Sequence, residues 1–216
     1  MKKAFIFDLD GVLINDEKTW EAEKQRLYKE LFGERVAAKM GSTLGINWDG
    51  IYEHAKNLGA GISKSKYLKV FFEIAPHIYE TSPIPVGVNE LIMGLKQNGY
   101  RLGIVSASPL SWVTTAINRL ERANDFELVL SLYERQDLKH KPDPDGYLEA
   151  VKLLSATPNS SIALEDSNPG INSAKAAGLF TIGYQGNLVE GYKQTGADAY
   201  AISMEDVLEL AKNFTH

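Results

Sequence analysis

Short apolar runs recur along the chain, and each ends at polar residues or glycine. The first is Ala-Phe-Ile-Phe at residues 4–7, which stops at Asp8. A continuous apolar run of this length is typical of a strand buried on both faces of a parallel sheet. Similar runs predict strands at residues 102–105, 126–130, 161–164 and 180–183, and a weaker pattern indicates a sixth at residues 198–202.

Helical patterns separate these runs. Amphipathic or proline-initiated stretches predict helices at residues 88–98, 109–120, 144–154, 169–177 and 204–212. Proline begins three of these stretches and glycine follows two, as is common at helix starts and ends. Strands that alternate with helices predict an α/β fold, here a Rossmann-like parallel sheet core with helices on both faces.

Residues 10–83 interrupt the alternation, because they contain no convincing strand. Helical patterns dominate there, at residues 17–32, 48–58 and 63–74. Connections between a strand and its helix are usually short, about 2–6 residues, so a segment of this length is better explained as an insertion. We therefore expect residues 15–83 to form an all-helical cap domain, and residues 1–14 and 84–216 to form the α/β core.

Composition limits the possible functions. The chain of 216 residues is 44% hydrophobic and 24% charged, which is ordinary for a globular protein. A net charge of −5 argues against a nucleic-acid partner, because such proteins usually present a basic face. The absence of cysteine excludes disulfides, thiolate nucleophiles and cysteine-ligated zinc. No segment has the ~18 apolar residues of a membrane span, and the first apolar run is too short for a signal peptide, so we expect a cytoplasmic protein without a membrane partner.

Two aspartates directly follow the first predicted strand. If the chain stays extended, the side chains of Asp8 and Asp10 project to the same side. Two close carboxylates are costly unless they share a proton or a cation such as Mg²⁺ neutralises them. The pair also allows one carboxylate to attack while the other transfers protons. The alternative is an acidic loop at the end of a strand.

Polar residues follow other predicted strands in the same way. Ser106 could hold a phosphate with nearby backbone N–H groups, or could only cap the next helix. Lys141 precedes a proline and could balance anionic charge, or could be a solvent-exposed lysine in a turn. Glu165 and Asp166 could complete a metal site, while Asp166 or Ser167 could also cap the helix that begins near residue 169. All these side chains are predicted at the carboxyl edge of the sheet, where α/β proteins bind ligands.

In chain order, these motifs resemble those of the haloacid dehalogenase-like superfamily. The similarity covers nearly the whole chain and is greatest to sugar-phosphate phosphatases and β-phosphoglucomutase-like proteins with a helical cap after the first motif. The stretches that carry it are residues 7–13 (Phe-Asp-Leu-Asp-Gly-Val-Leu), 105–108 (Val-Ser-Ala-Ser), 140–144 (His-Lys-Pro-Asp-Pro), 164–167 (Leu-Glu-Asp-Ser) and 169–171 (Pro-Gly-Ile).

The resemblance implies an enzyme that transfers a phosphoryl group to Asp8. It implies that Asp10 protonates the leaving group and then deprotonates water. The implied Mg²⁺ ligands are the Asp8 side chain, the Asp10 backbone carbonyl and Asp166, with Glu165 close by. The groups implied to hold the phosphoryl group are Ser106, Ala107 and Lys141.

Departures from related motifs refine this expectation. Dehalogenases of the superfamily typically lack an aspartate at the position of Asp10, which favours phosphoryl chemistry here. The mutase cap begins with an Asp-Thr pair followed by a histidine. The corresponding stretch here is residues 15–20, and no histidine follows it in that predicted helix, so we favour a phosphatase over a mutase. Asp16, Trp20 and the loop 41–45 are the candidate substrate contacts in the cap, although Trp20 could equally belong to the cap core.

Two other classes share some of these features. A phospho-signalling receiver domain also combines an acid pair, a phosphoryl-accepting aspartate and a lysine, but it is shorter and lacks a helical insert. A non-catalytic binding module would usually lose an acid from the motif set, and Asp8, Asp10 and Asp166 are all present. We expect a small phosphorylated metabolite as the partner, without identifying it, and a monomer or weak homodimer.

Overall fold

A six-stranded parallel sheet forms the centre of the molecule. The computed structural model describes residues 2–41, 43 and 48–215. The strand order is β3-β2-β1-β4-β5-β6, and every neighbouring pair is parallel. The strands are β1 (Lys3–Phe7), β2 (Tyr100–Ser106), β3 (Phe126–Ser131), β4 (Ile162–Glu165), β5 (Phe180–Tyr184) and β6 (Ala199–Ala201). The expected parallel α/β fold is confirmed, including the weakly indicated sixth strand.

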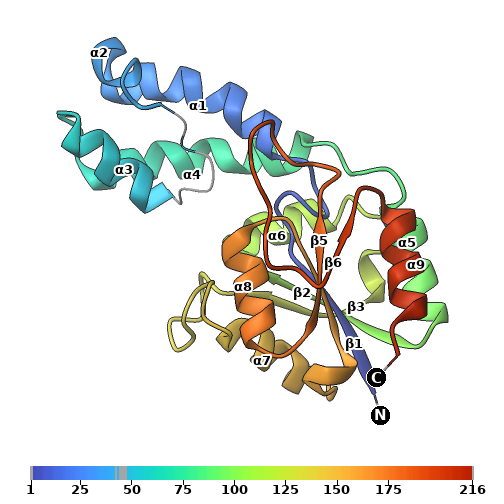
Figure 1. The fold of residues 1–216 in the computed structure, drawn as a ribbon. Helices are drawn as coiled ribbons and strands as arrows, with labels where there is room; N and C mark the ends of the chain where they lie inside the picture. The colour runs from blue at the N-terminus through green and yellow to red at the C-terminus, as the bar shows by residue number, and fades with distance from the viewer. Residues whose placement is uncertain (1, 42, 44–47, 216) are drawn as a thin grey trace.

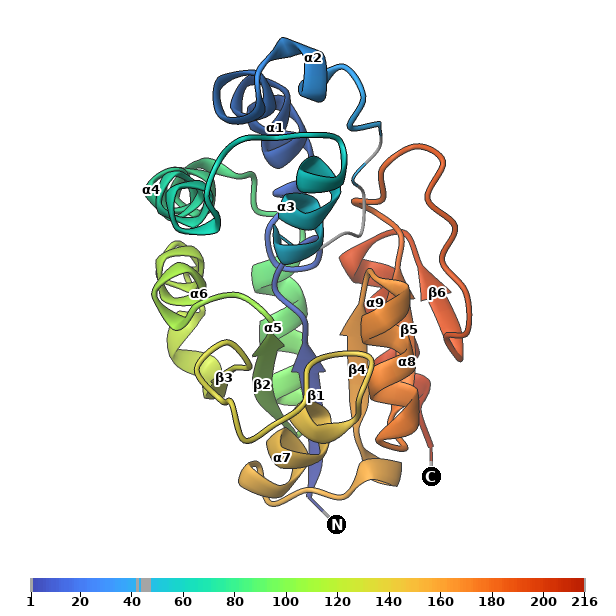
Figure 2. The same ribbon diagram turned by 90° about the vertical axis from the view of Figure 1, so that its left-hand side faces the viewer.

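The sheet is buried on both faces, as its continuous apolar strands require. Phe5 and Phe7 of β1 pack into one hydrophobic cluster, while Ala4 and Ile6 point to the other face and join a second cluster. The first cluster contains apolar residues of α5 (Val88–Gln97), α6 (Leu110–Ile117) and α9 (Met204–Asn213); the second contains residues of α7 (Asp145–Leu153) and α8 (Asn168–Ala176). Figure 2 shows α7 and α8 in front of the sheet and α5 and α9 behind it.

A group of helices lies at the carboxyl edge of the sheet, between β1 and α5 in the chain. These helices are α1 (Glu17–Phe32), α2 (Glu34–Ala37), α3 (Trp48–Asn57) and α4 (Lys64–Thr81). Both chain termini lie at the opposite end of the molecule (Figure 1). The two connections to this helical segment meet, because the Asn15 N–H donates to the carbonyl of Pro83 at 2.8 Å. That contact supports our proposal that residues 15–83 form a cap on a core of residues 1–14 and 84–216.

Helix α4 continues further than the sequence pattern predicts. We expected a helix over residues 63–74, whereas α4 runs through Pro76 to Thr81. A proline within a helix removes one backbone hydrogen bond, but burial of apolar residues on the following turn can offset that loss. Ile78 and Tyr79 are 0% and 2% exposed, so the extra turn is packed. This turn brings a cap residue close to the loop after β1.

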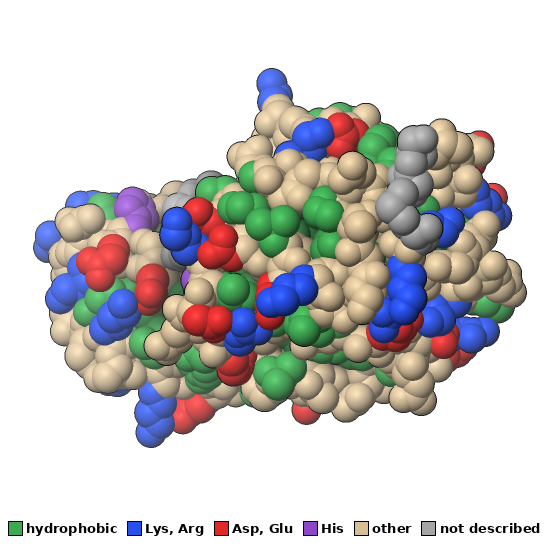
Figure 3. Space-filling view, turned by 90° about the horizontal axis from the view of Figure 1, so that it is seen from below, with side chains coloured by type: hydrophobic (Ala, Val, Ile, Leu, Met, Phe, Trp, Pro, Cys, Tyr) green, Lys and Arg blue, Asp and Glu red, His purple; other side chains and the backbone are tan. Residues whose placement is uncertain are grey.

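The surface carries charges of both signs. On the face shown in Figure 3, acidic and basic side chains are interspersed around apolar ones. Among the described residues, no helix combines the length and the apolar character needed to cross a membrane.

Candidate active site

The loop after β1 is held at the carboxyl edge of the sheet by hydrogen bonds from three directions. The Asp8 N–H donates to the Leu164 carbonyl at 2.9 Å, which extends the pairing of β1 with β4. Gly11 follows with a φ of 75°, a left-handed conformation that glycine adopts readily. Its N–H donates to Asp16 Oδ1 at 3.0 Å, and its carbonyl accepts from Asn187 Nδ2 at 2.9 Å. The loop therefore presents Asp8 in a fixed position.

Lys141 connects two buried carboxylates. Its Nζ donates to Asp8 Oδ1 and to Glu165 Oε1, both at 2.6 Å, and to the Val105 carbonyl at 3.1 Å. Burial alone would lower the pKa of Lys141, but the charges of Asp8 and Glu165 raise it well above its usual range. Lys141 is therefore a permanent cation beside Asp8, and not a solvent-exposed lysine in a turn.

Glu165 is completely buried, and its carboxylate forms hydrogen bonds with the side chains around it. In addition to the Lys141 contact, its Oε1 accepts from the Tyr147 hydroxyl at 2.6 Å. Its Oε2 accepts from the Ser167 hydroxyl at 3.2 Å, while Ser167 also begins helix α8 by accepting from the Gly170 N–H. Both oxygens of Glu165 thus already take part in hydrogen bonds that fix Lys141 and the start of α8.

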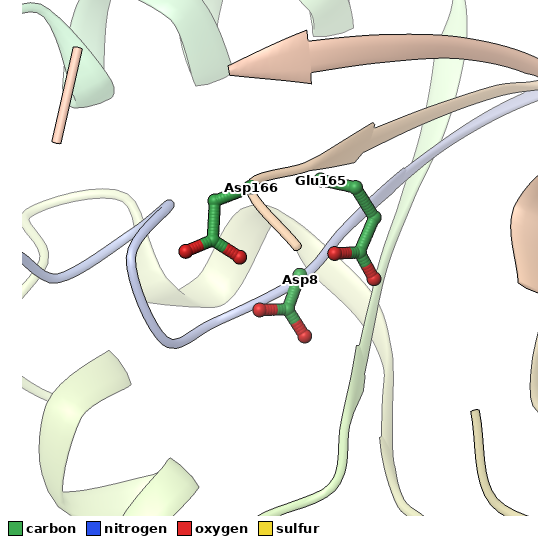
Figure 4. Close-up of side chains that lie close together, drawn as sticks. All are labelled: Asp8, Glu165 and Asp166. Atoms are coloured by element: carbon green, nitrogen blue, oxygen red, sulfur yellow. The ribbon is translucent and has the colours of Figure 1, made fainter. Parts of the chain in front are cut away.

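Three carboxylates converge at the ends of β1 and β4. One oxygen each from Asp8, Glu165 and Asp166 lie within 4.8 Å of one another, and Figure 4 shows the side chains gathered between the two strand ends. Burial, opposed by Lys141 and reinforced by Glu165 and Asp10, raises the pKa of Asp8 to about 8. The cluster holds three acids and one lysine, and clustered oxygen ligands suit a hard divalent cation, which would favour the ionised form of the acids.

Asp166 and Gly11 are closely fitted to each other. A Cβ atom added at Gly11 would lie 2.0 Å from Asp166 Oδ2 and 2.6 Å from its Cγ. A side chain at residue 11 would therefore displace the Asp166 carboxylate from the cluster. The backbone carbonyl of Asp166 is also held, because Gln194 Nε2 donates to it at 2.7 Å.

Asp10 lies beside the candidate phosphate-binding loop. Its Oδ2 accepts from Ser108 Oγ at 2.9 Å and from Ser106 Oγ at 3.3 Å. Its Oδ1 accepts from the Tyr79 hydroxyl at 2.6 Å. The side chain of Ser106 is fully buried at the end of β2, and Ala107 is exposed at the start of the loop. The two aspartates, the loop and Lys141 thus come together as the sequence predicts, while their roles stay predictions.

The two predicted substrate contacts of the cap have clear structural surroundings. Asp16 is 2% exposed and accepts the Gly11 N–H, so it stabilises the loop that carries Asp8. Trp20 is 8% exposed and stacks on Phe71 of α4, with ring centroids 4.7 Å apart. This packing supports the alternative that Trp20 belongs to the hydrophobic core of the cap. Of the loop 41–45, only Gly41 and Thr43 lie within the described residues.

Several residues that build the site carried no recognisable signal in the sequence. They are Tyr79, Ser108, Tyr147, Asn187 and Gln194. Ser108 belongs to a motif that was noted, but its contact with Asp10 was not expected. Tyr79 lies beyond residue 74, the predicted end of this helix. The other three come from α7 and from the segment between β5 and β6, where no motif distinguishes them.

A parallel α/β sheet, a helical segment after its first strand and an acid–lysine cluster at its carboxyl edge together define the class of protein. The chain belongs to the haloacid dehalogenase-like hydrolase family, whose model matches residues 5–184. This membership confirms the resemblance and makes the chain an enzyme of that family.

Known proteins similar to this chain include phosphatases and a mutase. Hexitol phosphatase B of Escherichia coli strain K12 is 29% identical over 185 residues, which cover 83% of this chain and 82% of the relative. The β-phosphoglucomutase of Bacillus subtilis is 28% identical over 223 residues, which cover 96% and 93%. Among solved structures, a HAD hydrolase of family IA, variant 3, from Entamoeba histolytica has a TM-score of 0.77 at 23% identity, with coverage of 98% and 100%. That structural likeness shows the fold.

Proposed function

We propose that this chain hydrolyses a small phosphomonoester, a sugar phosphate, through a phosphoryl group carried briefly by Asp8. The observation that carries the proposal is the position of Asp8, whose Oδ1 lies 2.6 Å from Lys141 Nζ while Asp10 lies beside the loop of Ser106. A candidate nucleophile, a candidate proton carrier and a cation thus lie at the same edge of the sheet. The similarity to named sugar phosphatases supports the class of substrate.

In the first step, an Asp8 oxygen attacks phosphorus. The bond between phosphorus and the leaving oxygen breaks as the new bond forms, and the proton of the Asp10 carboxyl moves to that leaving oxygen. Lys141 and the backbone N–H of Ala107 offset charge on the equatorial phosphoryl oxygens. An alcohol leaves, and Asp8 carries the phosphoryl group.

In the second step, water attacks the phosphoryl group on Asp8. The Asp10 carboxylate accepts a proton from that water, and the bond between phosphorus and the Asp8 oxygen breaks. Inorganic phosphate forms, Asp8 regains its carboxylate, and Asp10 is again protonated for the next cycle. The same two aspartates therefore account for both halves of the reaction.

The carboxylate cluster fits a divalent cation such as Mg²⁺. Asp8 and Asp166 would hold it, with Glu165 nearby, because these are the three acids whose oxygens converge. When bound, Mg²⁺ would favour the ionised form of Asp8 and offset the negative charge of the phosphoryl oxygens. The excess of acids over lysine at this cluster is the structural reason to propose the ion.

A panel of phosphomonoesters tests the function. Phosphate release would be measured from glucose 6-phosphate, sorbitol 6-phosphate, β-glucose 1-phosphate, phosphoglycolate and a nucleoside monophosphate, with Mg²⁺ and with EDTA. We expect release from at least one sugar ester, reduced at least about 10²-fold by EDTA, since a lost metal ion removes several kcal/mol of charge stabilisation. Absence of release from every ester in the presence of Mg²⁺ would contradict the proposal.

The same panel distinguishes a phosphosugar mutase from a phosphatase. The similarity to a β-phosphoglucomutase over 96% of the chain makes this the second candidate function. A mutase would convert β-glucose 1-phosphate into glucose 6-phosphate without releasing phosphate. That result would replace the hydrolase proposal and retain Asp8 as the phosphoryl acceptor.

A substitution at Gly11 is expected to damage the metal site. Gly11→Ala places a Cβ atom 2.0 Å from Asp166 Oδ2 and should lower phosphate release at least about 10²-fold, because small misplacements of site groups are costly. It should also reduce the rise in melting temperature that Mg²⁺ causes. Gly99→Ala is the matched control, with a φ of 78° and no atom within 4 Å of the added Cβ. Equal effects of the two substitutions would show that backbone strain alone explains the loss.

A further inference from the structure

Tyr79 connects the helical segment to the candidate proton carrier. It lies in the last turn of α4, only 2% exposed, and its hydroxyl donates to Asp10 Oδ1 at 2.6 Å. A tyrosine hydroxyl is protonated at neutral pH. Tyr79 therefore acts as a hydrogen-bond donor to the Asp10 carboxyl group.

The other oxygen of Asp10 is held as well, so the orientation of the whole carboxyl group is defined. Ser108 Oγ donates to Oδ2 at 2.9 Å and lies 2.9 Å from the Tyr79 hydroxyl. Contacts on both oxygens restrict rotation of the carboxyl group about its bond to Cβ. Each carboxyl oxygen has two acceptor positions. Ser108 and Ser106 use both positions of Oδ2, whereas Tyr79 uses one position of Oδ1, so the second position of Oδ1 stays available for the proton that the reaction needs.

Tyr79 is itself fixed by the core. Its ring lies 5.4 Å from that of Trp112, and its backbone carbonyl accepts from Arg119 Nη1 at 2.9 Å. Trp112 lies in α6, and Arg119 follows directly after that helix. The hydrogen bond to Asp10 therefore requires the end of α4 to lie against α6.

We propose that Tyr79 is a positioning residue, whose hydroxyl orients the Asp10 carboxyl toward the leaving oxygen of the substrate. Protonation of the leaving group then depends on how α4 is docked on α6. The proposal rests on the phosphatase function above and adds a residue of the helical segment to the reaction. Tyr79 acts through Asp10 and need not touch the substrate.

If Tyr79 orients Asp10, its removal should slow alkyl and aryl esters to different extents, which a purely structural role would not do. An alkyl phosphate releases a strongly basic alkoxide, so its cleavage depends on proton donation by Asp10. p-Nitrophenyl phosphate releases a weakly basic phenolate and needs little proton donation. Misorientation of Asp10 should therefore slow the alkyl ester far more than the aryl ester. A general loss of structure would slow both equally.

The test measures kcat/KM of Tyr79→Phe for two esters: p-nitrophenyl phosphate and the alkyl ester of the panel that wild type hydrolyses fastest. This parameter reports the steps up to transfer of the phosphoryl group. We expect a loss of about 10–10²-fold for the alkyl ester and less than about 3-fold for the aryl ester. Tyr67→Phe is the matched control, because Tyr67 is a buried tyrosine of α4 whose hydroxyl bonds no group in the described part of the chain. It should change neither value.

A double variant shows whether Tyr79 acts through Asp10. Tyr79→Phe added to Asp10→Asn should cause no further loss for the alkyl ester, since the group that it orients is already removed. Equal losses for both esters, unchanged activity, increased activity or an additional loss in the double variant would each overturn the positioning role. Wild-type protein that turns over no ester would instead overturn the phosphatase function on which the role rests.

Discussion

Asp8→Asn is expected to lower phosphate release at least about 10³-fold for every ester, because the neutral amide is a poor nucleophile. Asp8 is the only carboxylate at the end of β1 with an oxygen 2.6 Å from Lys141 Nζ among the described residues. Initial rates with saturating Mg²⁺ and the best ester of the panel measure the loss.

The fold of the Asp8→Asn variant should survive. Burial raises the pKa of Asp8 to about 8, so the site tolerates a neutral group at this position. We expect the melting temperature in EDTA to stay within about 4 °C of wild type, while the rise caused by Mg²⁺ is largely lost. Asp125→Asn is the control, since Asp125 lies before β3, at the opposite edge of the sheet. Retention of a tenth of the wild-type rate would exclude Asp8 as the nucleophile.

Lys141→Met should affect both activity and stability. The substitution removes the charge that faces the transferring phosphoryl group, and loss of one such contact costs about 10²–10³-fold in rate. It also leaves Glu165, which is 0% exposed, without its cation. Breaking a buried ion pair by removing one partner costs about 3–5 kcal/mol of unfolding free energy. Urea unfolding in EDTA and initial rates with Mg²⁺ measure the two effects.

A second substitution separates the two effects of Lys141. Adding Glu165→Gln to Lys141→Met removes the uncompensated buried charge, so it should recover much of the stability and none of the activity. Lys175→Met is the matched control, because Lys175 pairs with Asp198 at a partly exposed site where an ion pair contributes about 0–1 kcal/mol. A Lys141→Met protein as stable as wild type, or a double variant without recovery, would show that the buried pair does not stabilise the fold.

The strands, most helices and the centre of the site could be predicted from local patterns. An apolar run that ends in a carboxylate indicates a buried strand, and it also places that carboxylate at the carboxyl edge of the sheet. Asp8, Lys141 and Asp166 are far apart in the sequence, yet the carboxyl ends of parallel strands lie at one edge. The sequence pattern thus predicts that these three side chains lie close together.

Bounds of helices were predicted less well where packing outweighs local preference. The sequence pattern predicts a helix that ends at residue 74, but burial of Ile78 and Tyr79 continues α4 to Thr81. The short helix α2 at Glu34–Ala37 carries no periodic pattern long enough to detect. The end of α4 and the existence of α2 both depend on tertiary contacts, which the local sequence pattern does not reveal.

Local patterns in the amino-acid sequence sufficed to predict the class of fold and to propose the helical insertion and the residues of the reaction, because each of these has a periodicity or a motif. The partners of those residues were decided by folding in three dimensions. Tyr79 meets Asp10, Gln194 meets Asp166 and Asn187 meets Gly11 across separations of 69, 28 and 176 residues. A single polar side chain at such a distance has no local signature, since its hydrogen bond exists only after the strands and helices have packed.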